Sequence, residues 1–361
     1  FDSASASALD LAHERVDIRV CSTGIMTLSF LAAMGLVLWV GGNKVMAGEM
    51  TVGTLTAFLT FMTILQMPVR QLGLLVNSFA RTSTCGARVF AFLDLQPAIS
   101  DRPGARDLVL TEAELRLDNV DFSYPGAVTT PVLQGLSFTA RRGETVGIIG
   151  PPGSGKSTLS HLIPRFYDVS GGKITIDGQD IRDLTLASLR RAVSVVAQDV
   201  FLFTTSLENN LAYAEPLAPE IDIHQASTDA QIHTHITGLK SGYRTVVGER
   251  GSSLSGGQRQ RMAIARSLLP DPAILIFDDS TAAVDANTEA RIRAALAKGA
   301  ATRVTLIIAH RLNSLLHADR ILFLDHGRIV EQGSHAELLA LNGRYRALYD
   351  LQTNGADREG Q

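Results

Sequence analysis

Two long stretches near the start of the chain consist of uncharged, mostly apolar residues. They run from Val20 to Val40 and from Met50 to Val69, and each holds about 20 residues. A helix of that length crosses the roughly 30 Å hydrocarbon core of a bilayer. A buried core helix of a soluble protein has a similar composition, but two such runs joined only by "GGNKVMAGE" favour a transmembrane hairpin.

Charged residues around the hairpin predict its orientation. The connecting segment Gly41–Glu49 holds one lysine and one glutamate, whereas five arginines flank the apolar runs. These are Arg15, Arg19, Arg70, Arg81 and Arg88. By the positive-inside rule, both ends of the hairpin are expected in the cytoplasm. Helical apolar spacing continues from Gln71 to Leu95, so we expect the second helix to extend beyond the membrane.

The remainder of the chain shows a different pattern. Pro97, Pro103 and Gly104 interrupt all periodicity, which predicts a partial transmembrane domain at 1–95, a linker at 96–112 and a second domain at 113–361. Short apolar strands then alternate with helical segments, which is typical of a mostly parallel sheet covered on both faces. The predicted strands are Leu115–Phe122, Thr145–Ile149, Val193–Ala197, Ala273–Phe277, Val304–Ile308 and Ile321–Leu324, and the predicted helices are Lys156–Arg165, Gln258–Leu269 and Ala286–Ala297. The early segments "RLDNVDFSYPG" and "LSFTARRGE" resemble antiparallel strands that lean on this core.

Composition supports a membrane-embedded segment. Of the 361 residues, 45% are hydrophobic and 19% charged, with a mean hydropathy of +0.14. The net charge of -3 gives no electrostatic argument for binding nucleic acid. Cys21 and Cys85 lack metal-ligand spacing and are expected to be isolated thiols. The chain opens on Phe1 with no basic region before an apolar run, so we expect no signal peptide and a fragment whose earlier membrane helices are missing.

The segment "TVGIIGPPGSGKSTL" combines a predicted strand, a glycine-rich loop and a helix start. It fits the G-x-x-x-x-G-K-[ST] pattern, in which backbone N–H groups surround phosphate oxygens. Lys156 is expected to neutralise the β- and γ-phosphates, and the Ser157 hydroxyl to bind Mg²⁺. Pro151 and Pro152 have no N–H group, so the donors must follow them. The predicted ATP-contacting residues of this loop are Gly150, Gly153, Ser154, Gly155, Lys156, Ser157 and Thr158.

A second phosphate motif lies about a hundred residues further on. It is "LSGGQ", made of Leu254, Ser255, Gly256, Gly257 and Gln258. A Ser-Gly-Gly turn at a helix N-terminus offers backbone donors and the positive end of the helix dipole to an anion. Two γ-phosphate sites on separate helices are expected when each nucleotide is sandwiched between two chains.

With these motifs in this order, the chain resembles the ATP-binding cassette (ABC) family, specifically exporter-type half-transporters. The resemblance covers nearly all of the chain after residue 112, and the hairpin looks like the last two membrane helices of such a transporter. It implies a transmembrane hairpin followed by an α/β P-loop nucleotide-binding domain with an antiparallel β subdomain and a helical subdomain. It also implies ATP and Mg²⁺, and an ATPase that drives transport as a dimer.

The resemblance further implies roles for single residues. Tyr124 in "FSYPG" would stack on adenine, and Gln198 in "VVAQD" would contact Mg²⁺ and the attacking water. Asp278 would hold Mg²⁺, Asp285 in "AAVD" would reach across the dimer, and His310 in "IIAHRL" would lie near the γ-phosphate. Without the motif order, Tyr124 would be read as an ordinary aromatic at a strand end and Gln198 as a solvated loop residue.

The segment "ILIFDDSTAAVD" places two acids, Asp278 and Asp279, at a strand end. Neighbouring side chains of a strand point to opposite faces, so the two acids are expected to do different work. The family usually has Glu at the second position, where the carboxylate activates water. Asp279 is one methylene shorter, which withdraws the carboxylate by about 1.5 Å, and misplacement on the order of 1 Å costs around a hundredfold in rate. We therefore predict a weakened catalytic site that still binds ATP.

A weakened site favours a heterodimer with a second half-transporter that has Glu at this position, although a homodimer stays possible. A regulatory subunit that mainly binds ATP, or an importer with exporter-type architecture, is the alternative to an exporter. The hairpin argues against a soluble ATPase and favours a multi-pass protein of the cell's inner or plasma membrane with a cytoplasmic nucleotide-binding domain. The transported substrate is not indicated: four polar residues of the hairpin would face either the cavity or neighbouring helices. They are Thr56, Thr60, Thr63 and Gln66. Because their segment is polar, His233 and His235 are expected on the surface.

Overall fold

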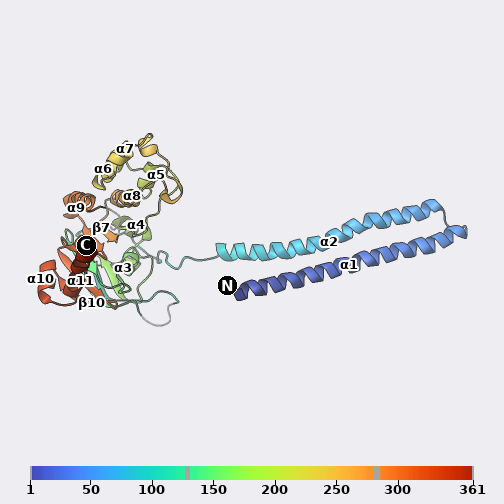
Figure 1. The fold of residues 1–361 in the computed structure, drawn as a ribbon, viewed down its shortest axis with the longest axis horizontal. Helices are drawn as coiled ribbons and strands as arrows, with labels where there is room; N and C mark the ends of the chain where they lie inside the picture. The colour runs from blue at the N-terminus through green and yellow to red at the C-terminus, as the bar shows by residue number, and fades with distance from the viewer. Residues whose placement is uncertain (1, 127–130, 280–284, 360–361) are drawn as a thin grey trace. The chain divides into compact units, whose positions relative to one another are not determined.

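A computed structural model describes residues 2–126, 131–279 and 285–359. It divides into two compact units, Phe1–Gln96 and Pro97–Gln361, which Figure 1 draws as one ribbon and which are described separately below.

The first unit is a helical hairpin. Helix α1 (Asp2–Met46) packs along helix α2 (Val52–Leu93), and Thr51 caps α2 by accepting a hydrogen bond from the Thr54 N–H group. Segments Ser5–Met46 and Val52–Val69 are long and apolar enough to cross a membrane, by length and composition. Most of the large apolar side chains of both helices are exposed, which is what a lipid-facing surface requires. Both predicted helices are present, and both extend well beyond the apolar runs.

The polar residues of α2 differ in their surroundings. The hydroxyls of Thr56, Thr60 and Thr63 each donate to the carbonyl four residues earlier, so the helix itself satisfies them. Gln66 lines a cavity of about 220 Å³ between the two helices, together with Thr27. Gln66 therefore borders an open space within the hairpin.

The second unit contains a six-stranded sheet in the order β10-β9-β3-β8-β7-β6. Strands β9, β3, β8, β7 and β6 run parallel, and β10 pairs antiparallel to β9 at the edge. The strands are β3 (Thr145–Ile149), β6 (Val193–Val196), β7 (Ile274–Asp278), β8 (Val304–Ile308), β9 (Arg320–Asp325) and β10 (Arg328–Gly333). The apolar runs of the parallel strands are mostly buried, as expected for a sheet covered on both faces, whereas the edge strand β10 is partly exposed. The predicted parallel sheet is confirmed.

A second sheet has four antiparallel strands in the order β2-β1-β4-β5. They are β1 (Leu115–Phe122), β2 (Leu133–Ala140), β4 (Gly171–Ile176) and β5 (Gln179–Asp180). Their inward side chains join those of β3, β7 and β8 in one apolar cluster, which confirms the predicted antiparallel strands against the core. Residues just before β1 also pack on this unit, since the Leu108 N–H group donates to the Ser188 hydroxyl.

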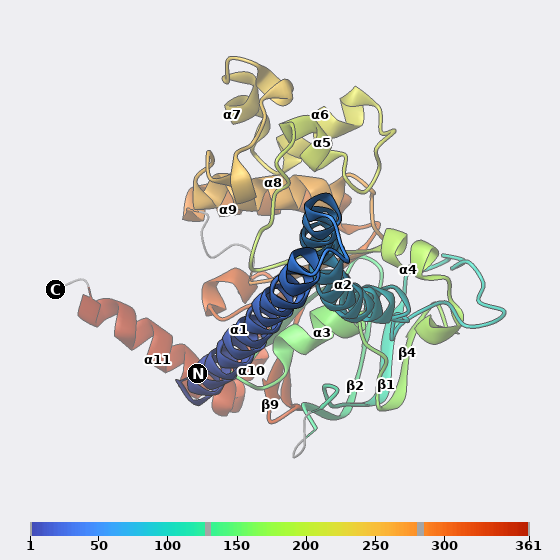
Figure 2. The same ribbon diagram turned by 90° about the vertical axis from the view of Figure 1, so that its right-hand side faces the viewer.

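Helices complete the unit. Helices α5, α6 and α7 gather on one side of α8, as Figure 2 shows, and share a separate apolar cluster with it. The helices are α3 (Lys156–Leu162), α4 (Leu186–Ala192), α5 (Leu207–Leu211), α6 (Glu220–Asp229), α7 (His233–Thr237), α8 (Gly256–Leu268), α9 (Ala286–Ala300), α10 (His335–Leu341) and α11 (Arg344–Glu359). Helix α3 ends at Leu162, earlier than predicted, and Arg165, the predicted last residue, has a left-handed φ of 55°.

The C-terminal helix α11 is anchored at its first turn. Tyr345 is fully buried beside Leu338 and Leu312, and its hydroxyl lies 2.7 Å from His335 Nδ1. The Glu331 carboxylate accepts hydrogen bonds from the first N–H groups of the helix, at Arg344 and Tyr345. Burial raises the pKa of Tyr345 to about 12, so this phenol stays neutral at physiological pH.

We predict that Tyr345→Ala detaches α11 from the domain. Removing a buried aromatic ring costs about 3–5 kcal/mol, whereas the Tyr345→Phe control loses one hydrogen bond, about 1 kcal/mol. Hydrogen–deuterium exchange of the whole protein should show faster exchange along α11 for the alanine variant and near wild-type exchange for phenylalanine. Equal protection in both variants would contradict this account of the anchor.

Candidate functional site

The glycine-rich loop between β3 and α3 depends on two close backbone approaches. A Cβ atom on Gly150 would lie 1.9 Å from the Leu324 carbonyl oxygen, so only glycine fits there. Gly155, with a φ of 96°, would bring a Cβ atom within 2.7 Å of the Leu133 side chain. The loop therefore closes tightly against β9 and β2, with its helix starting at Lys156.

Lys156 is 4% exposed and bonded within its own loop. Its Nζ atom donates to the carbonyls of Gly150 at 2.8 Å and Pro151 at 2.9 Å. Burial lowers the pKa of Lys156, and the negative charges of Asp278 and Asp279 partly oppose that shift. An incoming phosphate would favour the charged ammonium in the same way, so this lysine is suited to exchange carbonyl partners for an anion.

The other polar groups of the loop are placed as follows. The Ser154 N–H group donates to the Pro151 carbonyl and the Thr158 N–H group to the Gly155 carbonyl. Two of the N–H groups that we expected to surround phosphate are thus engaged within the loop itself. Gly153 has a φ of 78° and open space around it, so it forms the outer bend of the loop.

Asp278 ends β7 and is 7% exposed. Its carboxylate accepts hydrogen bonds from two hydroxyls of α3, Ser157 at 3.1 Å and Ser160 at 2.7 Å. Carboxylate and hydroxyl oxygens are the hard ligands that Mg²⁺ prefers, so Asp278 and Ser157 fit the predicted metal. Sequence reasoning missed Ser160, although its spacing of three residues from Ser157 places both on one helix face.

Asp279 leaves the strand in a left-handed turn, with a φ of 45°. Its N–H group donates to the Ile308 carbonyl at 2.8 Å, and its Oδ1 atom accepts from the His310 N–H group at 3.4 Å. Asp278 therefore faces α3 while Asp279 faces the end of β8. The two side chains point in different directions because the chain turns after Asp278. We had predicted this divergence from strand alternation, but the strand ends at Asp278.

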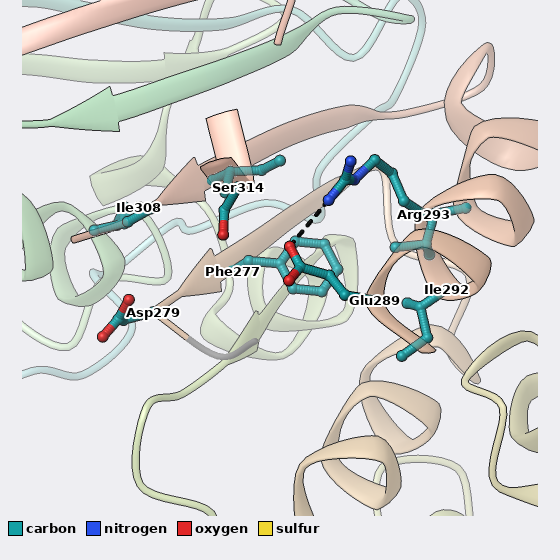
Figure 3. A pocket seen from close by; sticks show the side chains of 10 residues that line it. Phe277, Asp279, Glu289, Ile292, Arg293, Ile308 and Ser314 are labelled. Carbon is teal, nitrogen blue, oxygen red and sulfur yellow. Dashed lines mark hydrogen bonds and ion pairs between the residues drawn. The ribbon is translucent and has the colours of Figure 1, made fainter. Parts of the chain in front are cut away.

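Figure 3 shows Asp279 at the rim of a small cavity whose far wall belongs to α9. The other carboxylate that lines this cavity, Glu289, binds Arg293 at 3.0 Å one turn along the same helix. Glu289 is thus already paired with a cation. Asp279 is the lining carboxylate that contacts the segment around His310.

Tyr124 lies beside the loop that follows β3. Its ring packs edge-on against Phe122 and Tyr167, with centroids 4.8 Å and 5.2 Å apart. Its hydroxyl lies 3.3 Å from both the Thr158 hydroxyl and His161 Nδ1. An aromatic ring is thus held next to the first turn of α3.

The remaining predicted residues follow neighbouring strands. Gln198 comes after β6, Asp278 ends β7 and His310 comes after β8, and these strands are parallel neighbours. The carboxyl ends of parallel strands meet at one sheet edge, where α/β proteins bind their ligands. Gln198 and His310 are both exposed there. The loop after β3 opens on the same edge.

Asp285 immediately precedes α9, and its carboxylate accepts from the Thr288 N–H group at 2.9 Å. That hydrogen bond lowers the pKa of Asp285. Here the residue acts as a helix cap, and its predicted reach across a dimer stays a prediction. The preceding motif residues 282–284 lie outside the described part of the chain.

The "LSGGQ" turn begins α8 with a capping box. The Ser255 hydroxyl accepts from the Gln258 N–H group, and the Gln258 side chain accepts from the Ser255 N–H group. Leu254 is buried in the cluster of α5 to α8, whereas α3 belongs to the cluster around β3. The turn containing Gly256 and Gly257 therefore stands on a different packing unit from the glycine-rich loop.

The expectation that His233 and His235 are plain surface residues is wrong. His233 Nδ1 lies 2.7 Å from the Tyr243 hydroxyl, and His235 Nδ1 lies 3.4 Å from Gln258 Nε2 in the capping box. Both histidines are half-buried, because the fully buried Ile236 docks α7 against its neighbours. The polarity of the segment hid this apolar contact.

Comparison with known proteins matches both units. A model of the ABC transporter family matches residues 133–282, and a model of the ABC transporter transmembrane region matches residues 1–69. The ATP-dependent lipid A-core flippase of Syntrophus aciditrophicus is 42% identical over 346 residues, which cover 95% of this chain and 57% of that protein. The heavy metal tolerance protein of Schizosaccharomyces pombe is 39% identical over 339 residues, 94% of this chain and 40% of that protein.

A solved structure gives the same result. A bacterial Atm1-family ABC exporter with ATP bound is 39% identical, with a TM-score of 0.75 over 92% of this chain and 57% of that one. This chain thus spans about half the length of the relatives it matches. The two family models together span more than half of the chain, and the resemblance inferred from its motifs is confirmed. The chain belongs to the ABC transporter family.

Proposed function

We propose that this chain binds and hydrolyses ATP to drive an exporter-type membrane transporter. The observation that carries the proposal is the grouping at one sheet edge of a buried lysine, a carboxylate bonded to two hydroxyls, and a second acid beside His310. In this arrangement the lysine would bind phosphate, the hydroxyl-bonded carboxylate would bind the metal, and the second acid would activate water. The hairpin Asp2–Leu93 supplies the membrane part, and we assign 1–95 to the membrane domain, 96–112 to a linker and 113–361 to the nucleotide-binding domain.

The chemistry follows from the residues. Lys156 and the loop N–H groups would hold the β- and γ-phosphates, while Tyr124 stacks on adenine. Ser157 and Asp278 would hold Mg²⁺, with Gln198 as a further ligand; bound there, the ion would neutralise phosphate charge. Asp279 would orient the attacking water. His310 would stabilise charge on the γ-phosphate.

The two packing units inside the domain support an ATP sandwich. Because the "LSGGQ" turn is built on α8, away from the core of the glycine-rich loop, we propose that it acts on the nucleotide of a second chain. Asp285 would lie at the same dimer contact. The partner would be another half-transporter of the family.

The transporter's orientation and cargo are proposals as well. The arginines around the hairpin favour both of its ends, and with them the nucleotide-binding domain, on the cytoplasmic side of the cell's inner or plasma membrane. The names of the relatives include a flippase and an exporter, which supports export over import. Gln66 is positioned to contact a substrate within the membrane part.

Asp279 favours the weaker member of a heterodimer. Its carboxylate is short, it is held by the His310 N–H group, and the neighbouring Glu289 is paired with Arg293 and offers no replacement. A partner with Glu at the equivalent position would then carry most of the hydrolysis. The alternative, a regulatory subunit that binds ATP with little turnover, rests on the same residue.

We predict that Asp279→Glu accelerates ATP hydrolysis by the whole protein in lipid. The extra methylene restores about 1.5 Å of reach, and correction on the order of 1 Å is worth up to about a hundredfold. Steady-state phosphate release by the two proteins, each assayed alone, measures the effect. Asp279→Asn is the matched control, since it keeps the short length and removes the charge.

If the wild type already turns over rapidly and Glu adds nothing, the short carboxylate suffices and a homodimer becomes the simpler arrangement. Slow turnover by the wild type together with a large gain for Glu supports the heterodimer.

We also predict that Ser157→Ala raises the Mg²⁺ concentration required for half-maximal hydrolysis by about tenfold, because the substitution removes one proposed metal ligand. Ser160→Ala is the control, because Ser160 also donates to Asp278 and is not a proposed ligand. Titration of Mg²⁺ at saturating ATP distinguishes the two. Equal Mg²⁺ dependence in both variants would assign Ser157 the same supporting role as Ser160.

A further inference from the structure

One side chain of the C-terminal helix holds the segment around His310 at two points. Gln352 Nε2 donates to the His310 carbonyl at 2.9 Å, and Gln352 Oε1 accepts from the Leu312 N–H group at 3.0 Å. Both functional ends of one amide thus bond the main chain on either side of Arg311. An amide that uses its donor and its acceptor on one short segment restrains both position and orientation of that segment.

The packing of α11 explains why the Gln352 side chain points toward the segment from His310 to Leu312. Tyr345, Leu348 and Tyr349 lie in one apolar cluster with the buried Leu312, and Gln352 follows at the next position of the same helical face. This helical face is therefore packed against the domain over the residues that precede Gln352. The 3₁₀ turn Leu312–Leu315 starts where Gln352 accepts its hydrogen bond, so the amide also caps that turn.

The opposite side of the same peptide segment is bound to the catalytic acid. The His310 N–H group lies 3.4 Å from Asp279 Oδ1, while the His310 carbonyl accepts from Gln352. The main chain of His310 is therefore held between Asp279 and α11. Loss of the second bond would leave the weaker one alone to position the residue.

We propose that Gln352 is a positioning residue for ATP hydrolysis, which fixes the main chain of His310 and thereby places the His310 side chain relative to Asp279. The proposal rests on the proposed function, since it assigns Gln352 an effect through His310. A role restricted to capping the turn at Leu312 is the competing structural explanation. The two differ in whether the hydrogen bond to the His310 carbonyl matters.

Two substitutions separate these explanations. Gln352→Met keeps the length of the side chain and removes both hydrogen bonds. Gln352→Glu keeps the acceptor for the Leu312 N–H group and removes the donor to His310. Thr353→Ala is the matched control on the neighbouring residue, because the Thr353 hydroxyl bonds only the Tyr349 carbonyl of its own helix among the described contacts.

Steady-state hydrolysis by the whole protein in lipid is the first measurement. We expect kcat to fall about tenfold for both Gln352 variants, with KM for ATP and the affinity for a fluorescent ATP analogue unchanged, and wild-type values for Thr353→Ala. Wild-type kcat in Gln352→Met overturns the proposal. Loss in Met with wild-type behaviour in Glu also overturns it, because the cap alone would then account for the effect.

A double-mutant cycle with His310→Ala tests the route of the effect. If Gln352 acts through His310, Gln352→Met adds no further loss in the His310→Ala background; full additivity contradicts the proposal. If His310→Ala itself leaves kcat unchanged, the proposed role of His310 in hydrolysis is wrong, and the inference about Gln352 falls with it. A fall for His310→Ala without one for Gln352→Met shows that the proposed function stands and the inference fails.

Hydrogen–deuterium exchange supplies a reading that does not depend on turnover. The Leu312 amide should exchange faster in Gln352→Met than in the wild type or in Thr353→Ala. It should stay protected in Gln352→Glu, which retains the acceptor. Unchanged protection of Leu312 in the methionine variant would refute the hydrogen bonds on which the proposal is built.

Discussion

The buried carboxylate of Asp278 is the contact on which the site depends. It ties the end of β7 to the first turn of α3 through Ser157 and Ser160, so the strand that carries the acids and the helix that carries the phosphate loop cannot shift independently. A buried carboxylate is stable only when its lone pairs are satisfied, and the two hydroxyls do this. Both elements belong to the same apolar core, which gives that edge of the sheet a rigid base.

Around this base, the contacts of Lys156 and Asp279 are the ones that a bound nucleotide would change. The carbonyl partners of Lys156 belong to its own loop, and Asp279 is bound through a longer contact to the His310 main chain. We expect a triphosphate to replace these contacts, whereas the bond from the Ser160 hydroxyl to Asp278 is 2.7 Å long and buried. ATP would thus rearrange Lys156 and Asp279 and leave the Ser160–Asp278 bond between α3 and β7 in place, while Gln352 of α11 holds the segment from His310 to Leu312.

The local motifs were predictable because each depends on a short run of sequence. The glycine-rich loop, the apolar strand before Asp278 and the capping turn at Ser255 are all local patterns, and the strands around them were placed to within a residue or two. Ser160, Gln352 and His235 were missed because their partners lie far away in the chain: 118, 42 and 23 residues respectively. Such pairings follow from packing, which periodicity does not reveal.

The left-handed turn at Asp279 gives a physical reason for the short acid. A φ of 45° crowds Cβ against the backbone, and among residues other than glycine, Asn and Asp adopt it most readily. A Glu side chain reaches further but adopts this left-handed conformation less readily. The reach of the carboxylate and the strain of the backbone therefore oppose each other at this position. An enzyme under strong selection for turnover accepts strain at its catalytic residue. A chain that contributes mainly its "LSGGQ" turn and its bound ATP would have no need to, and Asp279 is the residue that we would expect in such a chain.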